Sequence, residues 1–320
     1  MGKFMVHGRD AGRCLNRISA NNVDGATGEI TYTQWLNTQG KLEADLTVTK
    51  LADDRFFVVV TDTMVRHAET WMKRNIPDGA HAFVTDVTSG YGQLNVQGPR
   101  SRELLQSLTS ADLSNSAFPF RAAREIDIGY ARVLCTRITY LGELGYELFI
   151  PTDQAAHVYD HVVAAGVKFG VMHAGLRALS SLRMEKGYRD YGHDLDNTDD
   201  PYETGLGFAV DLKKPDGFIG KEALLERKAK GPLQRRLVSI LVKDPEPQML
   251  HAEIVRRDGK AVGYVRAASY GHTLGGAVGL VFLEPKQTVD EAYLTSGTWE
   301  VEIAGKRYPA PRFGVDHYER

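Results

Sequence analysis

A short pattern of apolar and polar residues occurs twice in the first half of the chain. Residues 2–19 alternate apolar and other residues as far as Gly8 and then change to helical spacing, and residues 92–109 do the same around Gly98. One offset of 90 residues relates the matching positions: Phe4 and Leu94, Val6 and Val96, Leu15 and Leu105, Ile18 and Leu108. Each copy therefore predicts a strand, a tight turn at the glycine, and a helix.

The same offset relates the segments that follow. Residues 55–61 and 145–151 are strand-like, and each leads into an amphipathic helix, predicted at 62–74 and 152–164. Further strands are expected at 28–36, 42–50, 82–87, 125–140 and 168–173. We therefore predict an α+β fold in which two ferredoxin-like units, residues 2–90 and 92–180, are related by a pseudo-twofold axis. Two sheets that meet in this way form a cleft, which is a usual place for a ligand.

The pattern of predicted elements changes after the repeat. Residues 174–192 predict a helix that packs on the two units, and a Gly- and Pro-rich connection leads to a short helix at 218–230. From Arg236 onward, short strands alternate with turns such as Asp258-Gly259, which is typical of a small β-barrel or sandwich. The expected domains are residues 1–230, which contain the repeat, and a C-terminal β-barrel at 231–320.

Composition narrows the class of protein. The net charge is −2, and no apolar run approaches the ~20 residues of a membrane span, so neither nucleic acid nor a membrane is an expected partner. The two cysteines, Cys14 and Cys135, are far apart, and no histidine group has metal-ligand spacing. We expect no metal, no disulfide framework, and a reducing compartment, either the cytoplasm or, in a eukaryote, the mitochondrial matrix.

Asp45 is the first candidate for chemistry, and it lies inside a predicted strand, KLEADLTVTK. Strand alternation places Leu42, Ala44, Leu46 and Val48 on one face and Asp45, Thr47 and Thr49 on the other. From the strand pattern alone, Asp45 is either a solvated surface carboxylate, which is the commoner case, or a functional group that faces the cleft.

The segment YLGELGYE, residues 140–147, supplies a second carboxylate. Its two glycines predict a tight turn, after which Glu147 and Phe149 share one face of a strand. The repeat aligns Glu147 with Phe57, so the two halves differ here in chemistry while they match in fold. Glu147 is either an exposed hairpin residue or a ligand contact, because two carboxylate oxygens accept parallel hydrogen bonds from a flat heterocycle held between aromatic rings.

Three cations follow within residues 181–192: Arg183, Lys186 and Arg189. Arg183 and Lys186 lie three residues apart and could share a helix face, where they would form local salt bridges or meet an anionic ligand tail. His193 and Asp194 are capable of acid–base chemistry, although a loop turn is the commoner explanation for such a pair.

Taken together, these segments resemble the glycine cleavage T-protein (aminomethyltransferase) superfamily over essentially the whole chain. The resemblance is strongest to the C-terminal folate domain of sarcosine and dimethylglycine dehydrogenases. It rests on the following segments: YTQWLNTQGKLEADLTV, YLGELGYELFIP, HAGLRALSSLRMEKGYRDYGHDLDNTDDPYETGLGFAV, FIGKEAL and YGHTLGGAVGL.

The resemblance implies a role for seven residues. It identifies Asp45 as the catalytic aspartate and Glu147 as the glutamate that binds the pterin ring. It adds five residues to the folate pocket: Tyr32, Thr47, Tyr140, Leu148 and Phe149. The family's usual A-R-D triplet is Ala178-Leu179-Ser180 here, so Arg183 or Lys186 becomes the candidate for binding the folate's glutamate tail.

The implied function is transfer of a one-carbon unit, carried on an amine nitrogen, to tetrahydrofolate. In this interpretation a flavoprotein oxidises an N-methyl amine and the folate captures the formaldehyde-level carbon. The sequence has no FAD-binding GxGxxG domain and begins almost at the family's K-F-x-V strand, so the expected FAD lies on a separate domain or subunit. The alternatives are a folate-dependent O- or S-demethylase and a non-catalytic folate-binding module.

Overall fold

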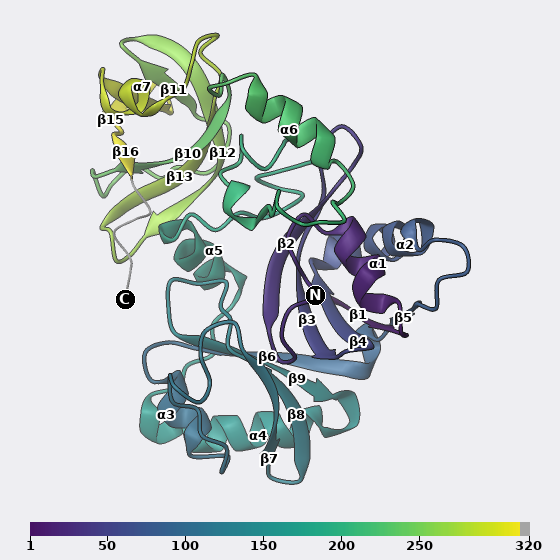
Figure 1. Cartoon of the computed structure of the whole chain (residues 1–320). Helices are drawn as coiled ribbons and strands as arrows, with labels where there is room; N and C mark the ends of the chain where they lie inside the picture. The colour runs from purple at the N-terminus through teal and green to yellow at the C-terminus, as the bar shows by residue number, and fades with distance from the viewer. Residues whose placement is uncertain (314–320) are drawn as a thin grey trace.

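Two antiparallel sheets of matching topology form the first half of the chain in the computed structural model, which describes residues 1–313 (Figure 1). The first sheet has the order β2-β3-β4-β1-β5, and the second, reversed, has the order β7-β8-β9-β6. The strands of the first sheet are β1 (Gly2–His7), β2 (Ile30–Leu36), β3 (Leu42–Ala52), β4 (Arg55–Val60) and β5 (Phe83–Asp86). Those of the second are β6 (Tyr91–Gln97), β7 (Ala123–Ile128), β8 (Ala131–Thr136) and β9 (Gly145–Pro151).

The 90-residue offset is kept in the pairing register of these strands. Gly2 pairs with Val60 between β1 and β4, and Gly92 pairs with Ile150 between β6 and β9. The turn after each first strand contains a glycine with positive φ, 127° at Gly8 and 119° at Gly98, a conformation that side-chain-bearing residues rarely adopt. The predicted repeat and its two turns are therefore confirmed.

Helices cover one face of each sheet. These are α1 (Ala11–Ile18) and α2 (Val65–Asn75) on the first sheet, and α3 (Ser101–Gln106) and α4 (Ala155–Gly166) on the second. Alternate strand residues such as Val58 and Leu148 form the two cores beneath the helices. Short 3₁₀ turns, Asp62–Met64 and Thr152–Gln154, precede α2 and α4.

The prediction of a strand at 168–173 was wrong. A 3₁₀ turn occupies Val167–Phe169, and Gly170 then takes a left-handed conformation with φ of 73°, which ends regular structure. The apolar side chains that follow, such as Met172, are exposed rather than packed on the sheet. The apolar pattern of this segment therefore reflects an exposed connection and not a fifth strand.

The two sheets pack on each other through the faces that carry no helices. Phe57 and Val59 of β4, which alternate with core residues of the first unit, lie in one cluster with Phe149 of β9. The Phe57 and Phe149 ring centroids are 5.0 Å apart. Backbone hydrogen bonds join the sheets as well, from Ile30 N to Arg121 O at 2.8 Å.

Helix α5 (Leu176–Glu185) and the connection after it join the two units to the C-terminal sheet. The Ser181 hydroxyl donates to the carbonyl oxygen of Tyr270 at 2.6 Å, so α5 packs on that sheet in addition to the units it was expected to cover. Met184 lies in a cluster that contains both Leu42 of the first unit and Leu280 of the C-terminal sheet. A short turn, Gly207–Ala209, and helix α6 (Lys221–Ala229) complete the connection.

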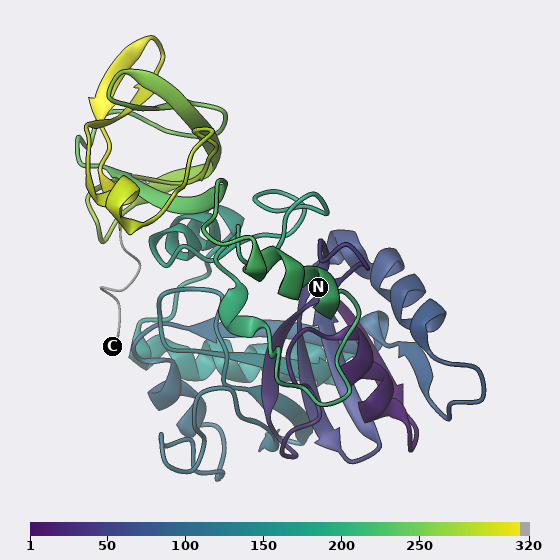
Figure 2. The same ribbon diagram turned by 45° about the horizontal axis from the view of Figure 1, so that its top comes forward.

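Seven strands curl around the last core in the order β15-β14-β11-β12-β13-β10-β16, which gives the barrel-like domain of Figure 2. Among residues 1–313, no ladder joins β15 to β16 to close the ring. The elements are β10 (Arg236–Val242), β11 (Ile254–Arg257), β12 (Lys260–Gly271), β13 (Gly276–Leu283), α7 (Glu291–Thr295), β14 (Trp299–Ile303), β15 (Lys306–Pro309) and β16 (Arg312–Phe313). Within the described residues, none of the helices has the length and apolar character needed to cross a bilayer.

Candidate functional site

Asp45 lies on the face of β3 that is turned toward the second unit. Its chain neighbours Ala44 and Leu46 enter the first core, so strand alternation directs Asp45 to the inter-sheet face. One carboxylate oxygen accepts a hydrogen bond from the Tyr32 hydroxyl at 2.8 Å, and the other accepts from Gln34 Nε2 at 2.9 Å. Tyr32 and Gln34 both belong to β2, where Gln34 is the cross-strand partner of Asp45.

The surroundings of Asp45 bring its titration close to neutral pH. Burial raises the pKa of Asp45 to about 6, while the hydrogen bonds from Gln34 and Tyr32 and the positive charge of Arg189 act in the opposite direction. A carboxyl group with this pKa is mostly ionised at pH 7 and still exchanges a proton readily, which suits a general acid or base.

Tyr140 of the second unit contacts the segment that follows α5. Its hydroxyl donates a hydrogen bond to the backbone carbonyl of Arg189, and its ring stacks on Tyr188 with centroids 6.0 Å apart. Burial is the main cause of the raised pKa of Tyr140; the charge of Arg183 acts against it, and the negative charges of Asp190, Asp194 and Asp45 add to it. The structure thus places a residue predicted from the second repeat within the electrostatic reach of a residue predicted from the first.

Glu147 stands on the corresponding face of the second sheet. It alternates with Tyr146 and Leu148, which enter the second core, and shares a face with Phe149 of the inter-sheet cluster. Burial raises the pKa of Glu147 to about 7, and none of residues 1–313 donates a hydrogen bond to its carboxylate. A partly desolvated carboxyl group without a donor is costly and is typical of a position that a ligand contacts.

The other predicted lining residues divide into two groups. Thr47 lies on the inter-sheet face, because it pairs with Tyr32 on one side and with Val59 on the other. Phe149 contributes its ring to the same face. Leu148 differs from the expectation: its side chain is fully buried in the second core, so only its backbone can line a site between the sheets.

Arg183, expected either to form a local salt bridge or to meet an anionic tail, forms the salt bridge. Its guanidinium forms a two-pronged ion pair with Asp194, with nitrogen–oxygen distances of 2.6 and 3.3 Å, and it also donates to the carbonyl of Tyr188. Arg183 is 6% exposed and Asp194 is fully buried, so this charge is already neutralised inside the protein. Asp194, which the sequence analysis considered as an acid or base, therefore stabilises the loop after α5.

Two residues near Asp45, Gln34 and Phe208, were missed by the sequence analysis, and Arg189 was named there only as one of three cations. Phe208 is 76% exposed, yet its ring stacks on Tyr32 with centroids 6.0 Å apart, which extends the aromatic surface beside Asp45. Gln34 could have been found by aligning the registers of the two strands, whereas a single phenylalanine in a loop carries no pattern.

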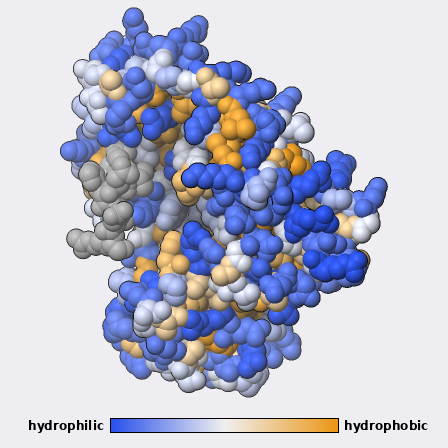
Figure 3. All heavy atoms as spheres, viewed as in Figure 1, coloured by the Kyte–Doolittle hydropathy of each residue, from blue (hydrophilic) through white to orange (hydrophobic). Residues whose placement is uncertain are grey.

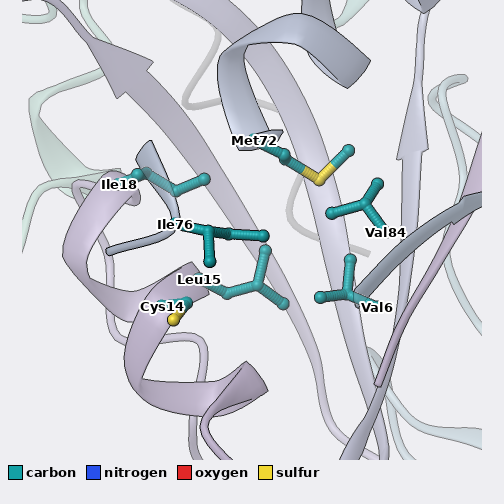
Figure 4. A pocket seen from close by; sticks show the side chains of 7 residues that line it. All are labelled: Val6, Cys14, Leu15, Ile18, Met72, Ile76 and Val84. Atoms are coloured by element: carbon teal, nitrogen blue, oxygen red, sulfur yellow. The ribbon is translucent and has the colours of Figure 1, made fainter. Parts of the chain in front are cut away.

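Two cavities elsewhere in the molecule contain none of the predicted site residues. A void of about 10 Å³ lies between α1, α2 and the first sheet, with only apolar side chains around it (Figure 4). That volume is at the lower limit for one water molecule, and the lining offers no polar side chain to bind one. A larger groove of about 690 Å³ lies in the C-terminal domain and contains none of the predicted site residues.

Neither the face drawn in Figure 3 nor the described metal-ligating residues indicate a second site. Figure 3 shows a mostly hydrophilic face with hydrophobic patches over the C-terminal domain and the second unit. Among residues 1–313, no group of three or more histidine, cysteine, aspartate or glutamate side chains is arranged to hold a metal ion.

The pKa of Glu147 predicts a pH-dependent stability. It rises from an ordinary 4.5 to about 7, so folding is favoured by protonation of this group, and that contribution is lost as the pH rises through 7. Glu147→Gln should therefore raise the free energy of unfolding by ~2–3 kcal/mol at pH 8 and change it little at pH 4. Urea unfolding of both proteins at the two pH values measures this difference, and an equal change at both would contradict the burial of the charge.

Both parts of the chain match protein-family models. Residues 1–214 match a model described as the GCVT N-terminal domain, and residues 235–314 match one described as the glycine cleavage T-protein C-terminal barrel domain. The chain is 39% identical over 308 residues to a 4-methylaminobutanoate oxidase (formaldehyde-forming) of Paenarthrobacter nicotinovorans, which covers 96% of the chain and 36% of the oxidase. It is 34% identical over 325 residues to human mitochondrial sarcosine dehydrogenase, with 97% and 35% of the two proteins covered.

A third relative is nearer to the chain in length. An aminomethyltransferase of Clostridium botulinum is 32% identical over 312 residues, covering 97% of the chain and 82% of that enzyme. Among solved structures, the glycine cleavage system aminomethyltransferase T of Bartonella henselae superposes with a TM-score of 0.83 over 98% of the chain and 82% of its own. That structure is 22% identical, so it supports the fold. The chain spans about a third of the length of the oxidase and the sarcosine dehydrogenase.

Proposed function

This chain belongs to the glycine cleavage T-protein (aminomethyltransferase) family, and we propose that it binds tetrahydrofolate and transfers to it a one-carbon unit carried on an amine nitrogen. The observation that carries the proposal is the carboxyl group of Glu147, which is half-buried on the inter-sheet face, has a pKa raised by burial, and receives no hydrogen bond from residues 1–313. A flat heterocycle with adjacent N–H donors satisfies both carboxylate oxygens at once.

The residues present fit a reduced folate. Glu147 would accept hydrogen bonds from the edge of the pterin ring, and Phe149 and Tyr140 would provide aromatic contacts beside it. The buried Gln34 Oε1, next to Asp45, is a further acceptor without a donor in the described part of the chain. When bound, tetrahydrofolate supplies the nucleophilic nitrogens that accept carbon at the oxidation level of formaldehyde.

Asp45 would act on the charge that develops during the transfer. Held by Tyr32 and Gln34, its ionised carboxylate stabilises a cationic nitrogen nearby. At about 4 Å and an effective dielectric constant near 20, such a pair contributes on the order of 4 kcal/mol. Because its pKa is about 6, Asp45 can also take up and release a proton at the same atom.

The amine donor and its oxidation form the finer part of the proposal. The two relatives of which this chain spans about a third are an oxidase of 4-methylaminobutanoate and a dehydrogenase of sarcosine. We infer that an FAD-dependent domain or subunit oxidises an N-methyl amino acid and that this chain receives the oxidised carbon. Such a donor carries a cationic nitrogen and a carboxylate in one small molecule.

Titration of the purified chain with tetrahydrofolate, with and without formaldehyde, tests the proposal. Binding with accelerated loading of the one-carbon unit indicates a transferase, and binding without acceleration indicates a non-catalytic folate-binding module. No binding at all would overturn the proposal.

Glu147→Ala is expected to weaken tetrahydrofolate binding about 10- to 100-fold, because two charge-assisted hydrogen bonds are lost. Glu125→Ala is a matched control, since Glu125 is an exposed glutamate on β7 of the same sheet. A titration curve of Glu147→Ala that overlays the wild type would remove Glu147 from the folate site.

A further inference from the structure

Arg189 is a cation that contacts no carboxylate among residues 1–313. Its Nε donates to the carbonyl of Thr204 at 3.0 Å, and its Nη1 donates to the carbonyl of Gly187 at 2.5 Å. Within residues 1–313, no carboxylate oxygen lies within 4.0 Å of the guanidinium, and Nη2 has no acceptor. Nearby arginines differ in this respect, since Arg183 pairs with Asp194 and Arg235 pairs with Asp199.

The guanidinium is held in one orientation beside the proposed catalytic carboxylate. The backbone carbonyl of Arg189 accepts from Tyr140, and its side chain fixes Thr204, four residues before the Phe208 ring that stacks on Tyr32. Burial lowers the pKa of Arg189, and the negative charges of Asp194 and Asp45 act in the opposite direction without touching it. Arg189 thus joins the loops that carry the aromatic residues of the site.

Arg189 and Asp45 are opposite charges that do not touch each other. No ion pair joins them within 4.0 Å, while each is fixed by hydrogen bonds to other groups. The carboxylate of Asp45 keeps lone pairs beyond those used by Tyr32 and Gln34, and Arg189 keeps the two N–H groups of Nη2. Two fixed, separated and partly unsatisfied opposite charges are complementary to a small molecule that carries both charges.

We propose that Arg189 and Asp45 together form a receptor for a zwitterion, in which Arg189 binds the carboxylate of the amino-acid donor and Asp45 faces its cationic nitrogen. This inference rests on the function proposed above and adds a residue that selects the donor. If Arg189 only linked the loops, that role would account for the hydrogen bonds of Nε and Nη1. It would not account for Nη2 or for a positive charge that no carboxylate contacts. Arg189 is therefore a specificity residue for the donor.

Two probes that differ only in the carboxylate test this assignment. N,N-dimethylglycine and N,N-dimethylethylamine carry similar cationic nitrogens at neutral pH, and the second lacks the carboxylate. Calorimetric titration of the wild-type chain should show a preference of about 10- to 100-fold for dimethylglycine, the range expected for a charge-assisted contact to a guanidinium. In Arg189→Met, this preference should fall to about 3-fold or less.

Two further variants keep the test decisive. Arg189→Gln retains an amide donor for the Thr204 carbonyl while it removes the charge, so it addresses the case in which Arg189→Met does not fold. It should also lose the preference. Arg132→Met is the control, because Arg132 is an exposed arginine on the β7–β8 hairpin, and its preference should equal that of the wild type.

The outcomes separate this inference from the proposed function. Tetrahydrofolate affinity should stay within a few-fold of wild type in both Arg189 variants. Equal binding of the two probes by the wild type, or a preference that survives in both variants, would overturn the inference while folate binding still supports the function. If the Arg189 variants lose folate affinity and keep their probe preference, the guanidinium binds the folate instead and the zwitterion receptor is wrong. Absence of folate binding by the wild type would reject the function itself.

Discussion

Asp45→Asn is expected to lower the rate of one-carbon transfer by ~10²–10⁴-fold while tetrahydrofolate affinity stays within a few-fold of wild type. Asparagine has nearly the same shape and retains an acceptor for the Tyr32 hydroxyl, which lies 2.8 Å from the carboxylate. It carries no negative charge and cannot take up a proton at the same atom. The loss should therefore fall on the transition state and not on ground-state binding.

Single-turnover measurements with saturating tetrahydrofolate, together with equilibrium titration, separate these two quantities. Asp53→Asn is a suitable control, because Asp53 follows β3 on the same chain segment and its side chain is 98% exposed. Comparable turnover in Asp45→Asn and wild type would remove Asp45 from the mechanism. A parallel loss of folate affinity would assign Asp45 to binding.

The pKa of Asp45 adds a pH dependence to the same reaction. Since burial raises it to about 6, the ionised form predominates above that pH and the protonated form below it. If the ionised carboxylate is the active form, the transfer rate should fall as the pH decreases through 6. A rate profile of Asp45→Asn that keeps the same inflection would show that another group causes it.

Arg183→Met is expected to destabilise the protein by ~3–5 kcal/mol, because it leaves a buried aspartate without its cation. Asp194 is fully buried and accepts hydrogen bonds from Arg183 at 2.6 Å and from the Asp190 backbone N–H at 2.9 Å. Methionine fills much of the space of the arginine stem but offers no donor. The loop that carries Arg189 should therefore lose its support.

The double variant Arg183→Met, Asp194→Leu should recover most of that loss, since no charge then remains buried without a partner. Urea unfolding of the wild type and the two variants measures this recovery, and tetrahydrofolate titration of the folded proteins provides a second reading. Reduced folate affinity with unchanged stability in Arg183→Met would identify Arg183 as a contact of the folate. The ion pair with Asp194 predicts the opposite result.

The sequence by itself determined the repeat and the faces of its strands. Alternation of apolar residues has a period of two in every strand, so residues 42–48 alone separated the core positions from Asp45 and Thr47. The offset of 90 residues fixed the matching registers, and the glycines at Gly8 and Gly98 marked turns that require positive φ. These features are local, which is why a single sequence reveals them.

Tertiary structure alone decided which charges are available to a ligand. Arg183 and Arg189 are equivalent in the sequence, six residues apart in one run, yet the fold places Asp194 against the first and backbone carbonyls against the second. The same holds for Phe208, whose ring stacks on Tyr32 from the turn Gly207–Ala209. These contacts join loops and elements that no repeating pattern links, so periodicity carries no information about them, and only the folded contacts set their charge and exposure.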